Sequence, residues 1–282
     1  MQSFFHYCSK GFKTEILFAS EEEFIAGLNR IAVCLAICRK AGRPVTVLAY
    51  CLMGNHFHFI LLGEESSCDV FAENFKKLTA MWVSRHRGSQ LSEPIIIGHW
   101  FVSPDKLGNR IVYVLRNPTA AGLRVVPHGY RWSSAHLMFS EWKPKNMKKA
   151  SEISERARNK ILNSTVSIPG DWFIADNMVW PGSVVSVPMA EKAFKTIGQF
   201  MFDLNNGNND RDAETEMKET HYSLPDSELR IRAQELAAEY YRRNKLSECN
   251  VQERLGIAKL LKKETWCNDK QLGRVLHLMP QD

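Results

Sequence analysis

Apolar and polar positions follow strand-like and helix-like periods through the first half of the chain. Short apolar runs of strand length alternate with segments whose apolar residues recur at three- and four-residue spacing. Strands are predicted at residues 4–9, 45–53, 56–62 and within 95–102, and helices at 21–40, near 68–87 and from 107 onward. This order of strand, helix, strand, strand, helix, strand and helix indicates an α+β fold with a mostly antiparallel sheet.

The first predicted helix has a clear start signal. Ser20 can accept a hydrogen bond from the backbone of the first helical turn. The acidic run Glu21–Glu23 places negative charge beside the positive end of the helix dipole. We therefore expect this helix to begin at Glu21 and to reach Lys40.

The pattern changes in the second half of the 282-residue chain. Residues 1–140 are expected to form one catalytic domain with the α+β order. Residues 141–224 are basic and rich in turns, with Pro169–Gly170 and Pro181–Gly182, and are expected to be a connector. From residue 225 to the end the helical period returns, which predicts a separate helical region.

This helical region has two possible functions. Two short helices joined at residues 265–268 would form a helix-turn-helix, whose second helix offers Lys270, Gln271 and Arg274 to DNA. The alternative is an ordinary helical bundle that does not read DNA.

Charge points to the class of partner. The chain has a net charge of +6, but residues 106–160 alone hold twelve Lys or Arg against three Glu, a balance of +9. Tyr130, Trp132 and Trp142 are interleaved with these cations. A basic segment with aromatic residues suits a polyanion, so nucleic acid is the expected partner.

Cysteine use and the apolar runs bear on the compartment. The seven cysteines are odd in number and form no Cys-x-x-Cys pair, which favours reduced core thiols in a cytoplasm. The N-terminus lacks the pattern of a signal peptide, and the apolar run at 31–38 is too short to span a bilayer. We therefore expect a cytoplasmic protein with no membrane partner.

The most specific chemical signal is the pair His56 and His58 in the third predicted strand. Side chains alternate along a strand, so both imidazoles point to one face while Phe57 and Phe59 point to the other. Gly54–Asn55 marks a hairpin turn just before them. Two imidazoles on one face can share a divalent cation, although hydrogen-bonded histidines at a sheet edge need no metal.

The third predicted helix can supply a nucleophile. Tyr113 and Asn117 are four residues apart and share a helix face, although Pro118 favours a place near the helix end for Asn117. A phenol ordinarily titrates near ~10, so attack on a phosphodiester would need a cation to polarise the phosphate. The product would be a phosphotyrosine that stores the bond energy for rejoining. Asn117 could add an oxygen ligand to that cation.

Three blocks in this order carry a family resemblance. They are Met53-x-Asn55-His56-x-His58, the run from Tyr113 to Leu123 with pattern Tyr-x-x-x-Asn-Pro-x-x-Ala-Gly-Leu, and Tyr130-Arg131-Trp132-Ser133-Ser134. Together they resemble the IS200-type single-tyrosine transposases, and most closely the REP-associated tyrosine transposases of bacteria. The resemblance covers about residues 4–140, roughly half of the chain.

This resemblance implies a ferredoxin-like α+β domain, usually dimeric, that nicks and joins single-stranded or hairpin DNA. It implies one Mg²⁺ or Mn²⁺ per active site, with His56, His58 and Asn117 as ligands and Tyr113 as the nucleophile that forms a 5′-phosphotyrosine. A bacterial, nucleoid-associated location would follow. The residues expected to contact DNA are Lys10, Arg116, Arg124, Arg131, Trp132, Lys143, Lys145, Lys270, Gln271 and Arg274.

Three other functions remain open from the residues. The first is a hairpin-DNA-binding protein derived from a transposase that no longer cuts. The second is a replication-initiator or relaxase-type nickase with the same two histidines. The third is a metal-dependent hydrolase with a water nucleophile, which would leave no protein–DNA adduct. Tyr130 is a rival nucleophile, ranked below Tyr113 because it lies in an irregular stretch.

Overall fold

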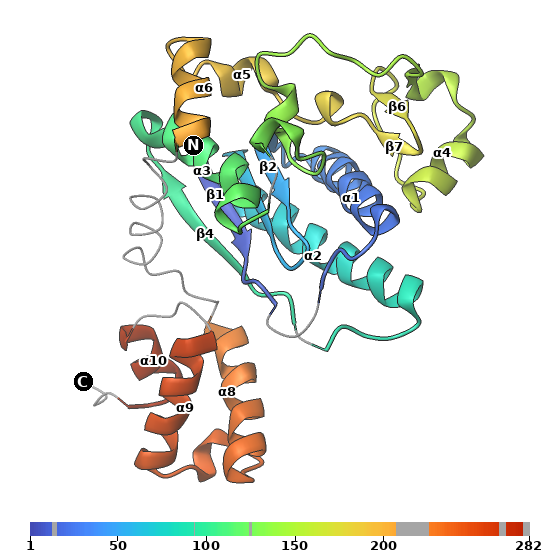
Figure 1. Ribbon diagram of the computed structural model, residues 1–282. Helices are drawn as coiled ribbons and strands as arrows, with labels where there is room; N and C mark the ends of the chain where they lie inside the picture. The colour runs from blue at the N-terminus through green and yellow to red at the C-terminus, as the bar shows by residue number, and fades with distance from the viewer. Residues whose placement is uncertain (13–15, 93, 124–125, 207–225, 265–268, 279–282) are drawn as a thin grey trace. The chain divides into compact units, whose positions relative to one another are not determined.

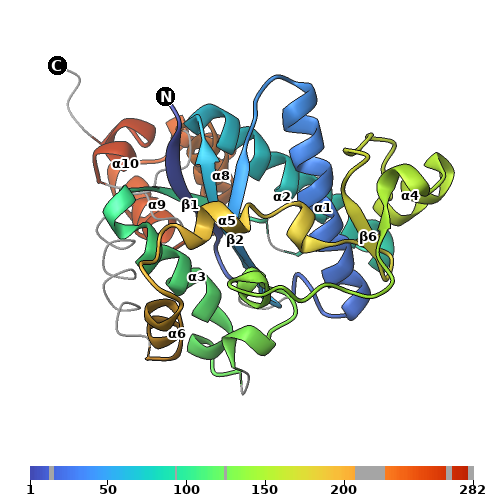
Figure 2. The same cartoon turned by 90° about the horizontal axis from the view of Figure 1, so that it is seen from above.

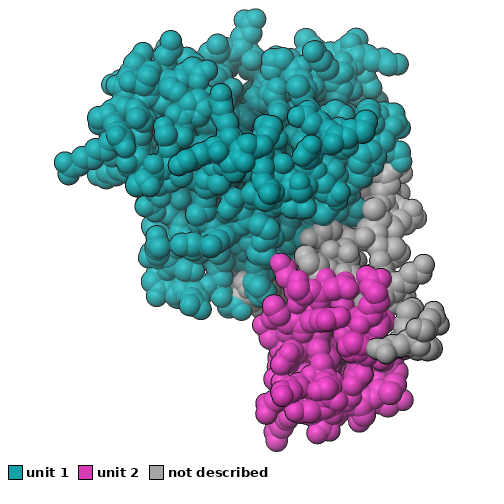
Figure 3. All heavy atoms as spheres, turned by 180° about the vertical axis from the view of Figure 1, so that it is seen from behind, with its two compact units in different colours: residues 1–213 teal, residues 214–282 magenta. Residues whose placement is uncertain are grey.

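The computed structural model divides the chain into two compact units, residues 1–213 and 214–282, which Figure 3 colours separately. The structure describes residues 1–12, 16–92, 94–123, 126–206, 226–264 and 269–278. Each unit buries its own set of apolar side chains and therefore has its own core.

The first unit is built on a four-stranded antiparallel sheet. The elements follow the chain as β1 (Ser3–Ser9), α1 (Glu21–Lys40), β2 (Thr46–Leu52), β3 (Phe57–Gly63), α2 (Glu65–Arg87), β4 (Ile97–Val102) and α3 (Leu107–Ala120). The strand order β2-β3-β1-β4 with this connectivity is the ferredoxin-like arrangement, so the expected fold class is confirmed.

Helices cover both faces of the sheet, as Figures 1 and 2 show. On one face Phe57, Phe59 and Leu61 pack with residues of α1 and α2. On the other face Ile60 of the same strand packs with α3 and α6 (Ile197–Asn206). Side chains alternate along a strand, so the two phenylalanines point to the face covered by α1 and α2. His58 is two residues from Ile60 and therefore points to the face covered by α3.

The start of α1 matches its prediction. The Ser20 hydroxyl accepts from the Glu23 backbone N–H, and the Glu23 carboxylate accepts from the Ser20 backbone N–H, so the two residues form a capping box. The same carboxylate accepts from Arg87 at the end of α2, at 2.7 Å and 2.8 Å. One acidic side chain thus caps α1 and ties it to α2.

Residues 148–206 differ from the expected connector because they pack within the first unit. Asn29 of α1 donates to the carbonyls of Ile161 and Asn177, and the Ser186 N–H donates to the Val47 carbonyl. Turn-rich composition predicts irregular backbone but cannot exclude burial by distant partners. The elements of this part are β5 (Lys148–Lys149), α4 (Glu155–Leu162), β6 (Phe173–Ala175), β7 (Met178–Val179), α5 (Val187–Glu191) and α6.

Short 3-10 turns link these elements. They lie at Pro104–Lys106, Pro127–Gly129, Ser134–Leu137, Ala150–Glu152 and Pro181–Ser183 in the first unit, and at Leu246–Glu248 in the second.

The second unit contains α8 (Asp226–Tyr241), α9 (Val251–Glu264) and α10 (Asp269–Val275). Both α9 and α10 pack against α8. The buried side chains include Leu229, Leu236, Ile257, Leu261, Leu272 and Leu276. Residues 265–268, the expected turn of a helix-turn-helix, lie outside the described residues. The helix-turn-helix therefore stays a prediction.

Two further observations concern the helices and the cysteines of the described residues. None of the helices in the described ranges is long and apolar enough to cross a membrane. The six cysteines within those ranges are free and buried.

Candidate metal and tyrosine site

Strand pairing brings a group of polar side chains together under α3. Cys8 of β1 lies opposite His58 of β3, and His6 lies opposite Ile60. His6, Cys8 and His58 are all buried, and one possible ligand atom from each lies within 4.8 Å of the others. The result is a buried patch of nitrogen and sulfur atoms on the sheet face that α3 covers.

Tyr113 lies over this patch. Its ring centroid is 5.9 Å from that of His58 and 5.8 Å from that of His6, both in edge-on geometry. Asn117 follows one helical turn later and its Nδ2 donates to the Tyr113 carbonyl at 3.2 Å. The shared helix face therefore brings the predicted tyrosine and asparagine to the predicted histidines, with Asn117 in the last turn of α3.

The hydrogen bonds of His56 define its tautomer. Asn55 donates through Nδ2 to the Phe12 carbonyl at 3.3 Å, so its Oδ1 is the atom 2.7 Å from His56 Nδ1. An amide oxygen can only accept, so the His56 proton is on Nδ1. His56 Nε2 is therefore a bare lone pair.

That lone pair faces another acceptor. His56 Nε2 lies 3.2 Å from Asn117 Oδ1, whose amide is oriented by the Nδ2 bond to the Tyr113 carbonyl. With a neutral His56, no proton stands between these two acceptors. A cation between them would remove the conflict, because neighbouring ligands of an ion at about 2.1 Å are separated by about 3 Å.

Burial keeps the imidazoles neutral. It lowers the pKa of His56 and, more strongly, the pKa of His58, whose protonation the neighbouring His56, His6 and Arg110 also oppose. The Asn117 side chain partly offsets this lowering of the pKa for both rings, because its amide oxygen would accept a proton from a protonated imidazole. Neutral imidazole is the form that ligates metals, so His56, His58 and Asn117 fit a divalent ion with nitrogen and oxygen ligands.

Two residues of this patch were not predicted from the sequence. His6 is fully buried, and its Nε2 lies 2.9 Å from His58 Nδ1. Cys8 is buried beside them, and burial raises the pKa of its thiol. Both precede the His-x-His pair by about 50 residues, and only the parity of the first strand could have hinted that they share a face.

Tyr130, the rival nucleophile, uses its hydroxyl in a hydrogen bond to the backbone. Its hydroxyl donates to the Leu52 carbonyl at 2.8 Å, and burial raises its pKa. Its ring packs against the apolar side chains on the sheet face that α3 covers, the face that includes Ile60. These contacts give Tyr130 a packing role and leave Tyr113 as the tyrosine beside the histidines.

The residues expected to contact DNA have different surroundings. Arg116 is buried and donates to the Leu204 carbonyl, so it ties α6 to α3 and is unsuited to a DNA contact. Trp132 stacks on Phe24 with ring centroids 4.8 Å apart, so it is part of the packing on α1. Arg131 is exposed, lies over the Trp132 ring and pairs with Glu21.

The remaining residues of that set divide by exposure. Lys143 and Lys145 are exposed, and Lys10 is partly buried. Arg274 pairs with Asp226 at 3.4 Å in the second unit. Arg124, and the side chains of Lys270 and Gln271, lie outside the described residues.

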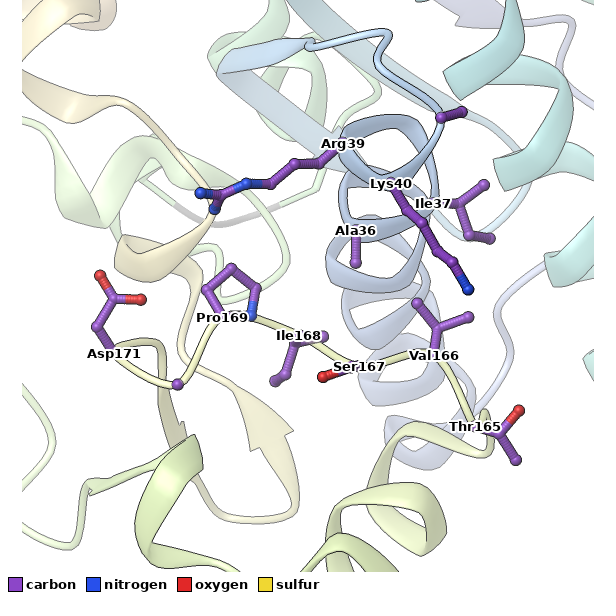
Figure 4. Close-up of a pocket in the computed structure, with 12 residues that line it drawn as sticks. Ala36, Ile37, Arg39, Lys40, Thr165, Val166, Ser167, Ile168, Pro169 and Asp171 are labelled. Atoms are coloured by element: carbon purple, nitrogen blue, oxygen red, sulfur yellow. The ribbon is translucent and has the colours of Figure 1, made fainter.

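Figure 4 shows a groove of about 1030 Å³ in the first unit. It is bordered by the end of α1, with Arg39 and Lys40, and by residues 165–171. None of the predicted site residues lines it. The groove is therefore separate from the site formed by the histidines and Tyr113.

Comparisons with known proteins add little to this geometry. No family model and no curated protein matches the chain. Among solved structures, the chain is similar to a REP-associated tyrosine transposase bound to a REP hairpin, with 14% identity and a TM-score of 0.34 over 63% of this chain and 88% of that one. A likeness at this level carries no argument about function, for which the basis is the geometry of the site.

Proposed function

We propose that this protein nicks and transfers single-stranded DNA, with Tyr113 as the nucleophile and a Mg²⁺ or Mn²⁺ ion held by His56, His58 and Asn117. The observation that carries the proposal is the pair of facing acceptors, His56 Nε2 and Asn117 Oδ1, at 3.2 Å and one helical turn from Tyr113. Under this proposal α3 supplies the nucleophile and one ligand, and the two histidines at the start of β3 supply the other ligands.

The bound ion would polarise the scissile phosphate and stabilise charge in the transition state. Tyr113 Oη attacks the phosphorus and loses its proton, while the 3′ oxygen leaves and takes up a proton as a free 3′ hydroxyl. The 5′ phosphate remains on Tyr113 as a phosphodiester. Attack by a 3′ hydroxyl on this linkage returns the phenol and joins the strand, with no nucleotide cofactor consumed.

The proposed DNA partner is supported by charge. The balance of +9 over residues 106–160 includes the exposed Lys143 and Lys145. Trp142 beside them is 63% exposed and could stack on an unpaired base. The expected homodimer stays a prediction.

The test is a covalent adduct assay. The protein is incubated with 5′-labelled and 3′-labelled hairpin DNA and Mn²⁺, and denaturing gels are examined for labelled protein. We expect an adduct with wild type that is lost in Tyr113→Phe, in His56→Ala and on addition of a chelator. Tyr130→Phe is the matched control, because it removes a hydroxyl from the same kind of residue and should keep the adduct.

Two outcomes would contradict the proposal. Cleavage without an adduct, retained in Tyr113→Phe, would favour a hydrolase with a water nucleophile. Tight hairpin binding without cleavage, equal in wild type and Tyr113→Phe, would favour a DNA-binding protein that no longer cuts.

A further inference from the structure

His6 is a buried polar residue that the proposed chemistry does not use. Its side chain is 0% exposed, and its ring stacks on that of His58 with centroids 5.2 Å apart. It also contacts the rings of Trp100 and Tyr113, at 5.7 Å and 5.8 Å between centroids. A buried imidazole is costly unless its nitrogens have partners, so the partners of His6 indicate its role.

One hydrogen bond links His6 to the proposed metal ligands. His6 Nε2 and His58 Nδ1 are 2.9 Å apart, so one proton lies between two nitrogens. If that proton is on His6, His58 Nδ1 is an acceptor and the neutral ring carries its own proton on Nε2. If the proton is on His58 Nδ1, then His58 Nε2 is a bare lone pair.

Only the second arrangement lets His58 Nε2 ligate a cation. Ligating histidines commonly donate their other ring N–H to a fixed acceptor, which sets the tautomer and the ring orientation. His56 has such an acceptor in Asn55 Oδ1 at 2.7 Å. His6 Nε2 occupies the corresponding place for His58.

We propose that His6 is a positioning residue that accepts the Nδ1–H of His58 and so directs His58 Nε2 to the divalent cation. This inference rests on the proposed function and extends it to the support of one ligand. In this arrangement the one N–H proton of the neutral His6 ring lies on Nδ1, which is buried and has no hydrogen-bond partner among the residues that the structure describes. A buried N–H without a partner is unfavourable, so a bound cation is needed to favour the proton on His58 Nδ1 over the proton on His6 Nε2.

A second ligand set can be separated from this role. Because His6, Cys8 and His58 lie within 4.8 Å, His6 could itself ligate a soft ion together with the Cys8 sulfur. A thiolate site prefers Zn²⁺ or Cu⁺, whereas nitrogen and oxygen ligands also accept Mn²⁺. Under our proposal Cys8 takes no part in Mn²⁺ binding.

The experiment measures Mn²⁺ binding to the full chain by isothermal titration calorimetry, with two amide variants of His6. The Oε1 of glutamine reaches the position of His6 Nε2, whereas the Oδ1 of asparagine reaches only that of Nδ1. We expect His6→Gln to keep the Kd within about threefold and His6→Asn to weaken it about 10–100-fold, the usual cost of losing such a support. Cys8→Ala should leave the Kd unchanged.

A spectroscopic measurement on the unmutated protein tests the proposal even where a variant fails to fold. Nitrogen NMR of ¹⁵N-histidine-labelled protein saturated with Mg²⁺ reports which ring nitrogen of His58 carries the proton. We expect protonation at Nδ1 and a bare Nε2, and the opposite pattern overturns the proposal.

The binding data distinguish two kinds of failure. Mn²⁺ binding by wild type that is equal in His6→Asn overturns the role of His6 and leaves the proposed function standing. An equal loss in His6→Asn, His6→Gln and Cys8→Ala also overturns it, in favour of a His6–Cys8–His58 metal site. Absence of Mn²⁺ binding by wild type overturns both the metal site and the support.

Discussion

Replacing Asn55 tests whether the loop before β3 sets the tautomer of His56. Asn55→Ala removes the acceptor 2.7 Å from His56 Nδ1 and the weaker bond to the Phe12 carbonyl at 3.3 Å. Without that acceptor, the His56 proton can move to Nε2, where it blocks a metal ligand. The change leaves Tyr113 and the three proposed ligands unmutated and removes only a contact of His56.

The size of the effect follows from the bonds removed. One hydrogen bond of about 1 to 1.5 kcal/mol corresponds to roughly a five- to thirteenfold change in affinity. Loss of a residue that orients a ligand reaches about 100-fold in metal sites. Because the Phe12 bond also holds the loop, we expect Asn55→Ala to weaken Mn²⁺ binding by about tenfold or more.

The assay is isothermal titration calorimetry with Mn²⁺, and thermal unfolding shows whether each variant is folded. Asn55→Asp is the matched control, because its carboxylate keeps the acceptor for His56 Nδ1 and loses only the donor to Phe12. It should bind Mn²⁺ at least as tightly as wild type. A folded Asn55→Ala protein with an unchanged Kd would refute the tautomer argument.

Three further predictions concern pH, stability and DNA. Burial lowers the pKa of His56 and His58 in the folded protein, so below about pH 6.5 the unfolded chain binds more protons than the folded one. The free energy of unfolding should therefore decrease as the pH is lowered. Urea denaturation between about pH 7.5 and about pH 5 checks this, and a flat profile would contradict it. Glu23→Ala should lower the free energy of unfolding by about 2 kcal/mol, because the carboxylate accepts from two backbone N–H groups and an arginine; a loss below about 0.5 kcal/mol in urea would count against that role. Lys143→Ala with Lys145→Ala should reduce the slope of log Kd against log salt for single-stranded DNA by about 1.4, and an unchanged slope would place these lysines away from DNA.

Much of the first unit could be predicted from the sequence because its signals are local. Period-2 alternation in β3 separates Phe57 and Phe59 from His58, and the structure places the phenylalanines in the core beneath α1 and α2. The Ser20 cap defines the start of α1 in the same way. Helical spacing alone places Tyr113 and Asn117 on one face.

Other features depend on partners far apart in the chain. Arg116 is a cation of the kind that contacts DNA, yet it is buried against α6 and donates to the Leu204 carbonyl of that helix. Residues 148–206 have the composition of a connector, yet the side chain of Asn29 and the backbone of Val47 hold parts of them. Burial of a polar segment depends on whether a distant element offers complementary donors and acceptors, and local composition does not encode that.

Local sequence patterns are therefore enough to predict the order of elements up to α3, the face of each strand residue and the candidate chemistry of His56, His58, Tyr113 and Asn117. The groups that surround these four residues follow from strand pairing and helix packing between distant parts of the chain. His6 meets His58 because β1 pairs with β3 across 52 residues, and Asn117 meets His56 because α3 packs on that face of the sheet. Periodicity is a property of neighbouring residues, whereas the tautomers and lone pairs that would hold a cation are defined by hydrogen bonds that close only when the sheet has formed.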